Sequence, residues 1–104
     1  MILTTSENVA GKKIKKTLGM VKGNTIKARH VGSDFVAGIK NIFGGEIKGY
    51  TKMINSARDE AINRMKEEAV KLNADAIISV RFTTSEVMQG AAEILAYGTA
   101  VKFK

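Results

Sequence analysis

The segment GGEIKGYT, residues 44–51, is the part of the sequence that comes closest to a phosphate-binding loop. A loop of the Walker type needs the pattern G-x-x-x-x-G-K-[ST], in which the lysine reaches the outer phosphates and the hydroxyl meets magnesium. The glycine spacing and Thr51 fit this pattern, but Tyr50 stands where the lysine is required, and Lys48 comes two residues early. No apolar strand leads into the segment either. The pattern therefore argues against a nucleotide-hydrolysing loop.

Two other roles remain open for this glycine turn. Main-chain amides at the start of a helix carry a partial positive charge, so the turn could bind an anion with help from neighbouring side chains. Glycine also permits positive φ and close packing between two helices, and we prefer this second interpretation. The residues of the anion-site hypothesis are Asp34, Lys40, Gly44, Gly45 and Lys48. Asp34 itself is better explained as the N-terminal cap of a short helix than as an acid or base.

Histidine, cysteine and the carboxylates restrict the remaining chemistry. His30 is the only histidine and there is no cysteine, so one chain cannot form an H-E-x-x-H motif, a disulfide or a thiolate metal site. We expect His30 in a partly exposed loop; the alternative is a symmetric oligomer in which several copies of His30 build a metal site. The acids of the pairs Asp59-Glu60 and Glu67-Glu68 diverge around a helix and predict a solvated face. No catalytic residue or cofactor is indicated, and an enzyme ranks last among the function classes.

The charge of the chain suggests a different class of partner. A net charge of +7 favours nucleic acid or an acidic partner, although only four of the 17 basic residues are arginine. Lys12, Lys13, Lys15 and Lys16 alternate between the two sides of a strand, so they do not form one broad basic face by themselves. We prefer the interpretation that these lysines protect a sheet edge, and contact with nucleic acid or an acidic partner is the alternative.

The elements that must position these residues follow from periodicity. Residues 12–28 predict a long strand or irregular hairpin, with Gly19 and Gly23 indicating bulges or a bend. Ser33 or Asp34 can cap a short helix over residues 35–43. A long helix over residues 50–72 is predicted from apolar residues three and four positions apart: Tyr50, Met53, Ile54, Ala57, Ala61, Met65, Ala69 and Leu72. Asn73 fits the left-handed position that ends a helix, and Glu60 with Arg64 and Glu67 with Lys71 have the spacing of ion pairs.

Two strands complete the chain. Residues 76–88 alternate, with Ile78, Val80 and Phe82 on one face, and residues 93–103 return after a turn at Gln89 and Gly90. The order strand, short helix, long helix, strand, strand predicts one α+β domain over residues 1–104, in which both helices cover one face of an antiparallel sheet. Both faces of the last strands carry apolar groups, so a partner subunit is the simplest cover for the second face.

The predicted short helix is unusually apolar. Five of its residues fall on one side: Phe35, Val36, Ile39, Ile42 and Phe43. This is too many for a short surface helix, so we expect them, together with Tyr97, to contact the sheet or a neighbouring subunit.

Several segments together resemble the YbjQ family of small uncharacterised bacterial and archaeal proteins, sometimes labelled heavy-metal-binding. They are SDFVAGIKNIFGG at 33–45, Tyr50, ARDEAINRMKEEAVKLNADAI at 57–77 and YGTAVKF at 97–103. The most specific residues are Asp34, Ala37, Gly38, Ile39, Lys40, Gly44 and Gly45. The sequence departs from the usual pattern at Lys40 and Glu46, where arginine is common, and at Asn73, where glycine is usual.

The resemblance implies a dodecin-like α+β subunit that assembles as a homopentamer. From it we expect a protein without catalysis of its own that binds a small ligand or a metal at subunit interfaces; the alternative is a polyanion or nucleic-acid binder. No signal peptide or membrane-spanning stretch is apparent, so we expect no membrane partner and a cytoplasmic location.

Overall fold

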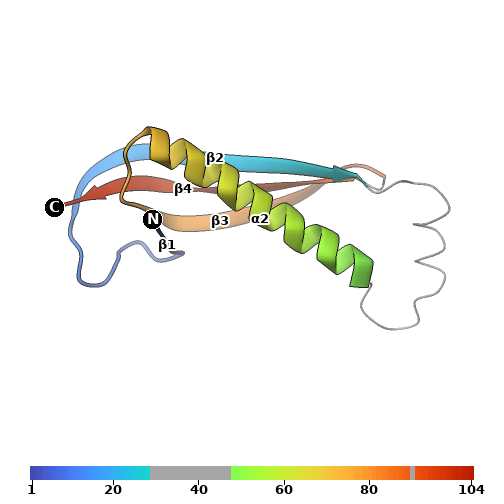
Figure 1. Cartoon of the computed structure of the whole chain (residues 1–104), viewed down its shortest axis with the longest axis horizontal. Helices are drawn as coiled ribbons and strands as arrows, with labels where there is room; N and C mark the ends of the chain where they lie inside the picture. Colours follow the sequence, from blue (N-terminus) through green and yellow to red (C-terminus); the bar gives the residue numbers. More distant parts are fainter. Residues whose placement is uncertain (29–47, 90) are drawn as a thin grey trace.

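The computed structural model describes residues 1–28, 48–89 and 91–104, and these form a four-stranded sheet with a long helix against one face (Figure 1). The strands are β1 (Ile2–Leu3), β2 (Ile14–Ala28), β3 (Ala76–Met88) and β4 (Ala91–Phe103), and the helix is α2 (Lys48–Lys71). The α+β class is confirmed. The predicted short helix over residues 35–43 lies outside the described residues, so the two-helix layout stays a prediction.

The sheet is mixed, and the expectation of a purely antiparallel sheet was wrong. Its strand order is β1-β3-β4-β2, with β4 antiparallel to both of its neighbours. The difference comes from β1, which runs parallel to β3 and pairs Ile2 with Ala76 and Leu3 with Ile77. Two residues carry too little periodicity to be recognised as a strand. The order also makes β2, which carries Lys15 and Lys16, an edge strand.

The ends of the main elements agree well with the sequence pattern. Helix α2 begins two residues before the expected Tyr50, and Asn73 has φ 60°, which is the left-handed conformation predicted after a helix. The amides of Asn73 and Ala74 donate to the carbonyls of Val70 and Ala69 at 2.9 and 3.1 Å. These bonds satisfy carbonyls that the last helical turn leaves without partners.

The core lies between α2 and one face of the sheet. Ala57, Ala61, Met65 and Ala69 form the fully buried stripe of the helix, as the three- and four-residue spacing predicted. Leu72 was expected to continue this stripe, but it is 43% exposed because the helix ends at Lys71. The sheet side of the core consists mainly of Val21, Ile77, Val80, Ile94, Ala96 and Ala100.

Gly23 is the point of closest approach between β2 and α2. A Cβ atom at this position would lie 2.3 Å from the carbonyl oxygen of Ala61 and 2.3 Å from the amide nitrogen of Met65. The ladder with β4 continues in register through Gly23, so a bulge at this residue was a wrong expectation. The bulge expected at Gly19 is present, with φ 126° and a register shift between Thr17 and Gly19. Gly23 is needed because any side chain would push the helix off the strand.

A bulge in β3 changes which residues face the helix. Ser79 has φ 54°, and the register with β4 shifts between Ile78 and Arg81. The extra residue places Ile77 and Val80 on the helix side and Ile78 on the opposite side, so the prediction that Ile78 and Val80 share a face was wrong. The N-terminal segment forms hydrogen bonds with the bulge: the amides of Ser79 and Val80 donate to the carbonyls of Ser6 and Thr4, respectively.

Among the helical residues that are described, none belongs to a helix with the length and apolar character needed to cross a bilayer.

Candidate functional site

The sheet face opposite α2 is rich in large apolar side chains. The strand register places five of them there, and we call this set the open face: Met20, Ile26, Ile78, Leu95 and Tyr97. Met20 and Ile26 are 71% and 58% exposed, and the other three are half-buried. In residues 1–28, 48–89 and 91–104, the only helix lies on the other side of the sheet (Figure 1). The open face therefore offers apolar surface to a further partner.

Polar groups lie among these apolar side chains. Asn24 Nδ2 donates to Glu93 Oε2 at 3.1 Å, and the register of β2 with β4 places both residues on the open-face side of the sheet. Arg81 pairs with Tyr97 in the ladder, and its Nη1 donates to the carbonyls of Thr5 and Val80, both at 2.9 Å. The open face is thus a mixed surface of apolar side chains and satisfied polar groups, as protein interfaces usually are.

A hollow of about 310 Å³ lies between β2 and the end of α2, beside the open face. Its described lining consists of Met20, Val21, Glu68, Lys71 and Leu72. The Glu68 carboxylate accepts a hydrogen bond from the amide of Lys22 at 3.1 Å, which fixes this acid at the edge of β2. Two exposed apolar side chains beside one lysine and one carboxylate can receive a small molecule with an apolar body and a polar group.

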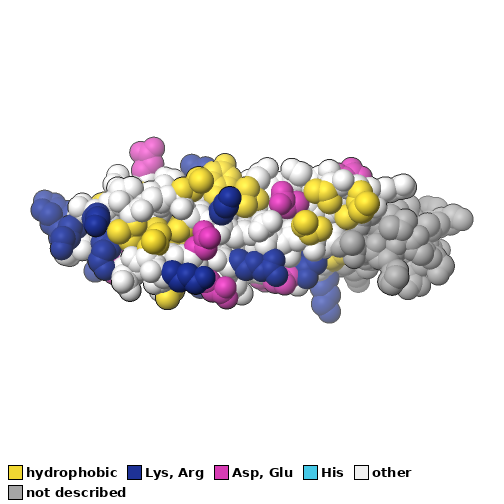
Figure 2. Space-filling view, turned by 90° about the horizontal axis from the view of Figure 1, so that it is seen from above, with side chains coloured by type: hydrophobic (Ala, Val, Ile, Leu, Met, Phe, Trp, Pro, Cys, Tyr) yellow, Lys and Arg dark blue, Asp and Glu magenta, His cyan; other side chains and the backbone are white. Residues whose placement is uncertain are grey.

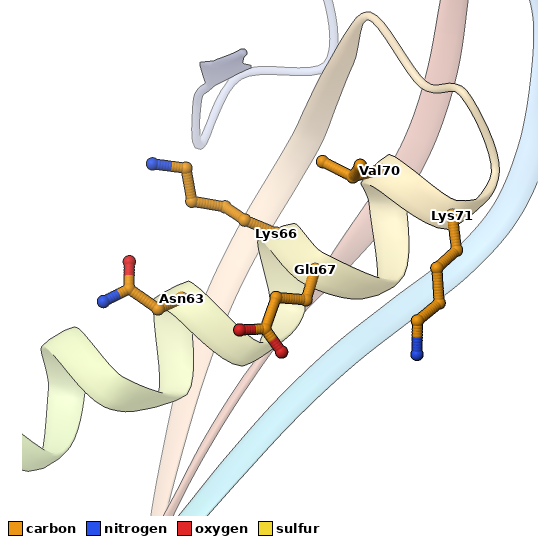
Figure 3. Close-up of a pocket in the computed structure, with 5 residues that line it drawn as sticks. All are labelled: Asn63, Lys66, Glu67, Val70 and Lys71. Atoms are coloured by element: carbon orange, nitrogen blue, oxygen red, sulfur yellow. The ribbon is translucent and has the colours of Figure 1, made fainter.

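A second and larger hollow, of about 600 Å³, lies on the outer side of α2. Figure 3 shows that all five labelled residues, Asn63, Lys66, Glu67, Val70 and Lys71, come from this one helix. The ion pair predicted between Glu67 and Lys71 is not formed, and their side chains point in different directions (Figure 3). No ion pair joins Glu67 to Lys66 or Lys71, so the hollow does not present a nucleophile beside an activating base.

Glu60 is the centre of the ion pairs in the described residues. Its carboxylate contacts Lys27 Nζ of β2, and its Oε1 lies 3.8 Å from Arg64 Nη2, which confirms the predicted helical pair. The hydrogen bond from Lys27, and then the charges of Lys27 and Arg64, lower the pKa of Glu60 against the opposing effect of desolvation. Arg64 Nη1 also donates to the carbonyl of Asn24 at 2.5 Å. This cluster fastens α2 to the edge of β2, which is a structural role.

The structure also joins two lysine groups that are far apart in the sequence. The ladder between β2 and β4 pairs Ile14 with Phe103 and Lys16 with Lys102, and the amide of Lys104 donates to the carbonyl of Lys13 at 3.0 Å. Six lysines therefore gather at one end of the molecule, which we call the lysine end: Lys12, Lys13, Lys15, Lys16, Lys102 and Lys104. Figure 2 shows the dark-blue side chains at the end where the C-terminus lies in Figure 1. Lys102 and Lys104 were not recognised from the sequence, although the pairing of the two long strands would have indicated them.

Most of the site residues predicted from the sequence lie outside the described residues. This applies to His30, to the anion-site candidates Asp34, Lys40, Gly44 and Gly45, and to the short-helix residues Phe35, Val36, Ile39, Ile42 and Phe43. Lys48 is the first residue of α2, and Tyr97 lies half-buried on the open face. The anion site and the His30 ring therefore stay predictions.

The residues that are described do not fit a heavy-metal site. Nowhere in residues 1–28, 48–89 and 91–104 do three or more His, Cys, Asp or Glu side chains come together in a way that could hold an ion. The whole chain lacks cysteine, which is the usual ligand of soft metals. Carboxylates alone are ligands for hard cations such as calcium and magnesium.

Comparison with known proteins extends the picture to the full chain. Residues 1–104 match the model of the YbjQ family, which is described as "Putative heavy-metal-binding". A UPF0145 protein of Archaeoglobus fulgidus is 58% identical over 104 residues, which cover 100% of this chain and 96% of the relative. A UPF0145 protein of Dehalococcoides mccartyi is 61% identical over 101 residues, covering 97% of each chain.

A crystal structure shows a similar fold at lower identity. It is that of a protein of unknown function from Pediococcus pentosaceus, assigned to the DUF74 family, with a TM-score of 0.69 and 22% identity over 100% of this chain and 98% of that one. This similarity supports the fold alone. The match of the family model over the whole chain and the identity above 50% to full-length relatives show that the chain belongs to the YbjQ family, also named UPF0145.

Proposed function

We propose that this protein is a non-catalytic, cytoplasmic homo-oligomer that binds a small ligand at its subunit interfaces. The observation that carries the proposal is the open face, where Met20, Ile26 and Tyr97 present apolar surface on the side of the sheet opposite α2. Burying exposed apolar surface contributes about 25 cal/mol per Å², so these side chains favour association of subunits. We take a second copy of the chain as the partner, because the family resemblance implies a homopentamer.

The ligand site is proposed in the hollow between β2 and α2. Met20 belongs both to the open face and to this hollow, so a subunit that docks on the open face would also enclose the hollow. Its volume of about 310 Å³ is at the lower end of the range for small-molecule sites. Lys71 and Glu68 supply one charge of each sign, so a ligand with an apolar body and a polar group suits it best.

A metal is a weaker alternative to this ligand. Because the described residues do not provide a set of metal ligands, a metal would require copies of His30 from several subunits. Elemental analysis of the purified protein and of His30→Ala separates the two cases. A stoichiometric metal that is lost in His30→Ala would favour the metal; a metal-free protein would favour the organic ligand.

Assembly is tested with one matched pair of variants. Ile26 and Val70 are both exposed apolar residues, at 58% and 61%, but Ile26 lies on the open face and Val70 on the outer side of α2. We expect native mass spectrometry to give pentamers for the wild type and Val70→Asp, and monomers for Ile26→Asp, because a carboxylate would be buried in the interface. A wild-type monomer at micromolar concentration, or equal effects of the two substitutions, would refute the proposal.

A further inference from the structure

The lysine end concentrates positive charge that the fold itself does not need. Its six lysines come from two stretches, residues 12–16 and 102–104, which the ladder between β2 and β4 places side by side. Five of the side chains are exposed and that of Lys102 is half-buried. Like charges at such short separations repel one another, so the cluster lowers the stability of the folded chain unless a partner compensates it.

Few acidic groups offset this charge. The ion pairs in the described part of the chain join Glu60 to Lys27 and Arg64, and neither involves the lysine end. Asp75 is one acid beside it: its Oδ2 accepts a hydrogen bond from the amide of Phe103 at 2.8 Å, and it forms no ion pair with a described lysine. Lys102 Nζ donates to the carbonyl of Asn73 at 2.8 Å, and Lys12 Nζ lies 6.0 Å from the centre of the Phe103 ring. These contacts orient two lysines without neutralising them.

Protection of a sheet edge explains only part of the cluster. Lys15 and Lys16 lie on the edge strand β2, where lysine discourages pairing with another sheet. Lys102 lies near the end of β4, beyond the last residue that pairs with β3, and pairs with Lys16 of β2; Lys104 directly follows β4. Protection of the β2 edge does not require two further lysines on the neighbouring strand end. The gathering of lysines from both chain segments therefore requires a further explanation.

The geometry points to the phosphate backbone of a nucleic acid as the partner. We propose that the lysine end is a surface that binds nucleic acid without sequence preference. The ladder places Lys16 beside Lys102, and a hydrogen bond between their main chains places Lys104 beside Lys13. Positive charges from two neighbouring chain segments thus lie side by side, which suits a polyanion with closely spaced charges. The lysine end has no arginine, which favours contacts to phosphates over reading of base edges.

Two other anionic partners suit the surface less well. Lysines attract anionic lipid headgroups, but stable attachment to a membrane needs a second, apolar signal, and Ile14 and Phe103, which lie among the lysines, are half-buried. An acidic protein is usually recognised with arginine forks and exposed aromatic side chains, which this end does not present. The proposal goes beyond ligand binding at subunit interfaces and does not depend on it, because one chain already contains the whole surface.

The test compares two variants that lose the same charge. Lys16→Gln/Lys104→Gln removes one exposed lysine from each stretch, and Lys52→Gln/Lys66→Gln removes two from α2. Fluorescence anisotropy with a labelled DNA oligonucleotide of mixed sequence, titrated between about 50 and 200 mM potassium chloride, gives the affinity and its salt dependence. The salt slope is the change in the logarithm of the binding constant with the logarithm of the salt concentration. Each phosphate contact contributes about 0.9 to its magnitude for duplex DNA and about 0.7 for single strands.

We expect Lys16→Gln/Lys104→Gln to weaken binding on the order of tenfold and to reduce the salt slope by about two, since each lysine neutralises roughly one phosphate. The α2 variant should bind nearly as the wild type does. Equal losses in the two variants would overturn the proposal, because they would show a response to net charge alone. Absence of DNA binding, together with binding to phosphatidylserine vesicles or to an acidic peptide, would also overturn it. Circular dichroism melting checks that both variants are folded.

Discussion

The two faces of the sheet differ in how their side chains are used. The face toward α2 has a small residue, Gly23, where the helix comes closest, and fills the space around this contact with buried side chains such as Val21, Ile77 and Ile94. The open face carries larger side chains, such as Ile26 and Tyr97, which remain exposed or half-buried. Close packing within the chain thus requires a small residue at the point of contact and complete burial of the large side chains beside it, whereas the large side chains of the open face lie where another molecule can cover them.

This comparison also separates stability from function. On the helix side, adding or removing one methyl group alters contacts that are already formed within the single chain. On the open face, the same change alters contacts that only a partner provides. Substitutions on the face toward α2 should therefore change the free energy of unfolding, and substitutions on the open face should change the association of subunits.

The largest effect is expected for Gly23→Val. The new Cβ would lie 2.3 Å from main-chain atoms of Ala61 and Met65, so α2 must move away from β2. We expect a loss on the order of 3 kcal/mol or more in the free energy of unfolding, measured by urea denaturation. Gly19→Ala is the control, because no atom lies within 4 Å of its added Cβ and only its φ of 126° opposes the change. A loss for Gly23→Val no greater than that of the control would contradict the close approach.

The second prediction uses one residue type on the two faces. Met65 belongs to α2 and is fully buried between the helix and the sheet, whereas Met20 is 71% exposed on the open face. Met65→Ala should lower the free energy of unfolding by about 2–5 kcal/mol, because it leaves a cavity. In the background of Ile26→Asp, which we expect to be monomeric, Met20→Ala should change it by no more than about 0.5 kcal/mol. Similar losses for both methionines would mean that the open face is packed within the single chain.

The smallest effect concerns the ion pairs at the border of the two faces. The pKa of Glu60 is lowered in the folded protein, mainly by Lys27, so the carboxylate contributes stability above the ordinary glutamate pKa of about 4.3. This contribution is lost as the pH falls through the lower, folded-state value. Urea unfolding at a series of acidic pH values should therefore show a shallower loss of stability for Glu60→Gln than for the wild type. Glu67→Gln removes an acid without an ion pair from the same helix and is the control for the loss of one negative charge. An equally shallow profile in both variants would count against the assignment to Glu60.

Local patterns predicted most of the elements. The bounds of β3, the left-handed Asn73 and the buried stripe of α2 follow from alternation, a cap and a helical repeat, which act over a few residues. The predictions that were wrong involve contacts between distant segments. Gly23 was interpreted as a sign of a bulge or bend because its contact with α2, about 40 residues later, has no local signal. The bulge at Ser79 coincides with hydrogen bonds to Thr4 and Ser6, which no alternation pattern in residues 76–88 can indicate.

The candidate site, too, was predictable only where it depends on residues close together in the sequence. The basic composition and the cluster at residues 12–16 could be read from the sequence, but the addition of Lys102 and Lys104 depends on strand pairing. The hollow between β2 and α2 combines Met20 with Leu72, which become neighbours only when the helix is laid across the strand.

By itself, then, the sequence determined the element types, the family and the absence of thiolate chemistry, because these depend on residue identity and short-range spacing. Only the tertiary structure decided which face of the sheet stays open, that the sheet is mixed, and where the lysines gather. The physical reason is that strand order and helix placement depend on burying apolar surfaces that are far apart in the sequence. The hydrophobic effect stabilises this burial, but it leaves no pattern among neighbouring residues that would show which surfaces meet.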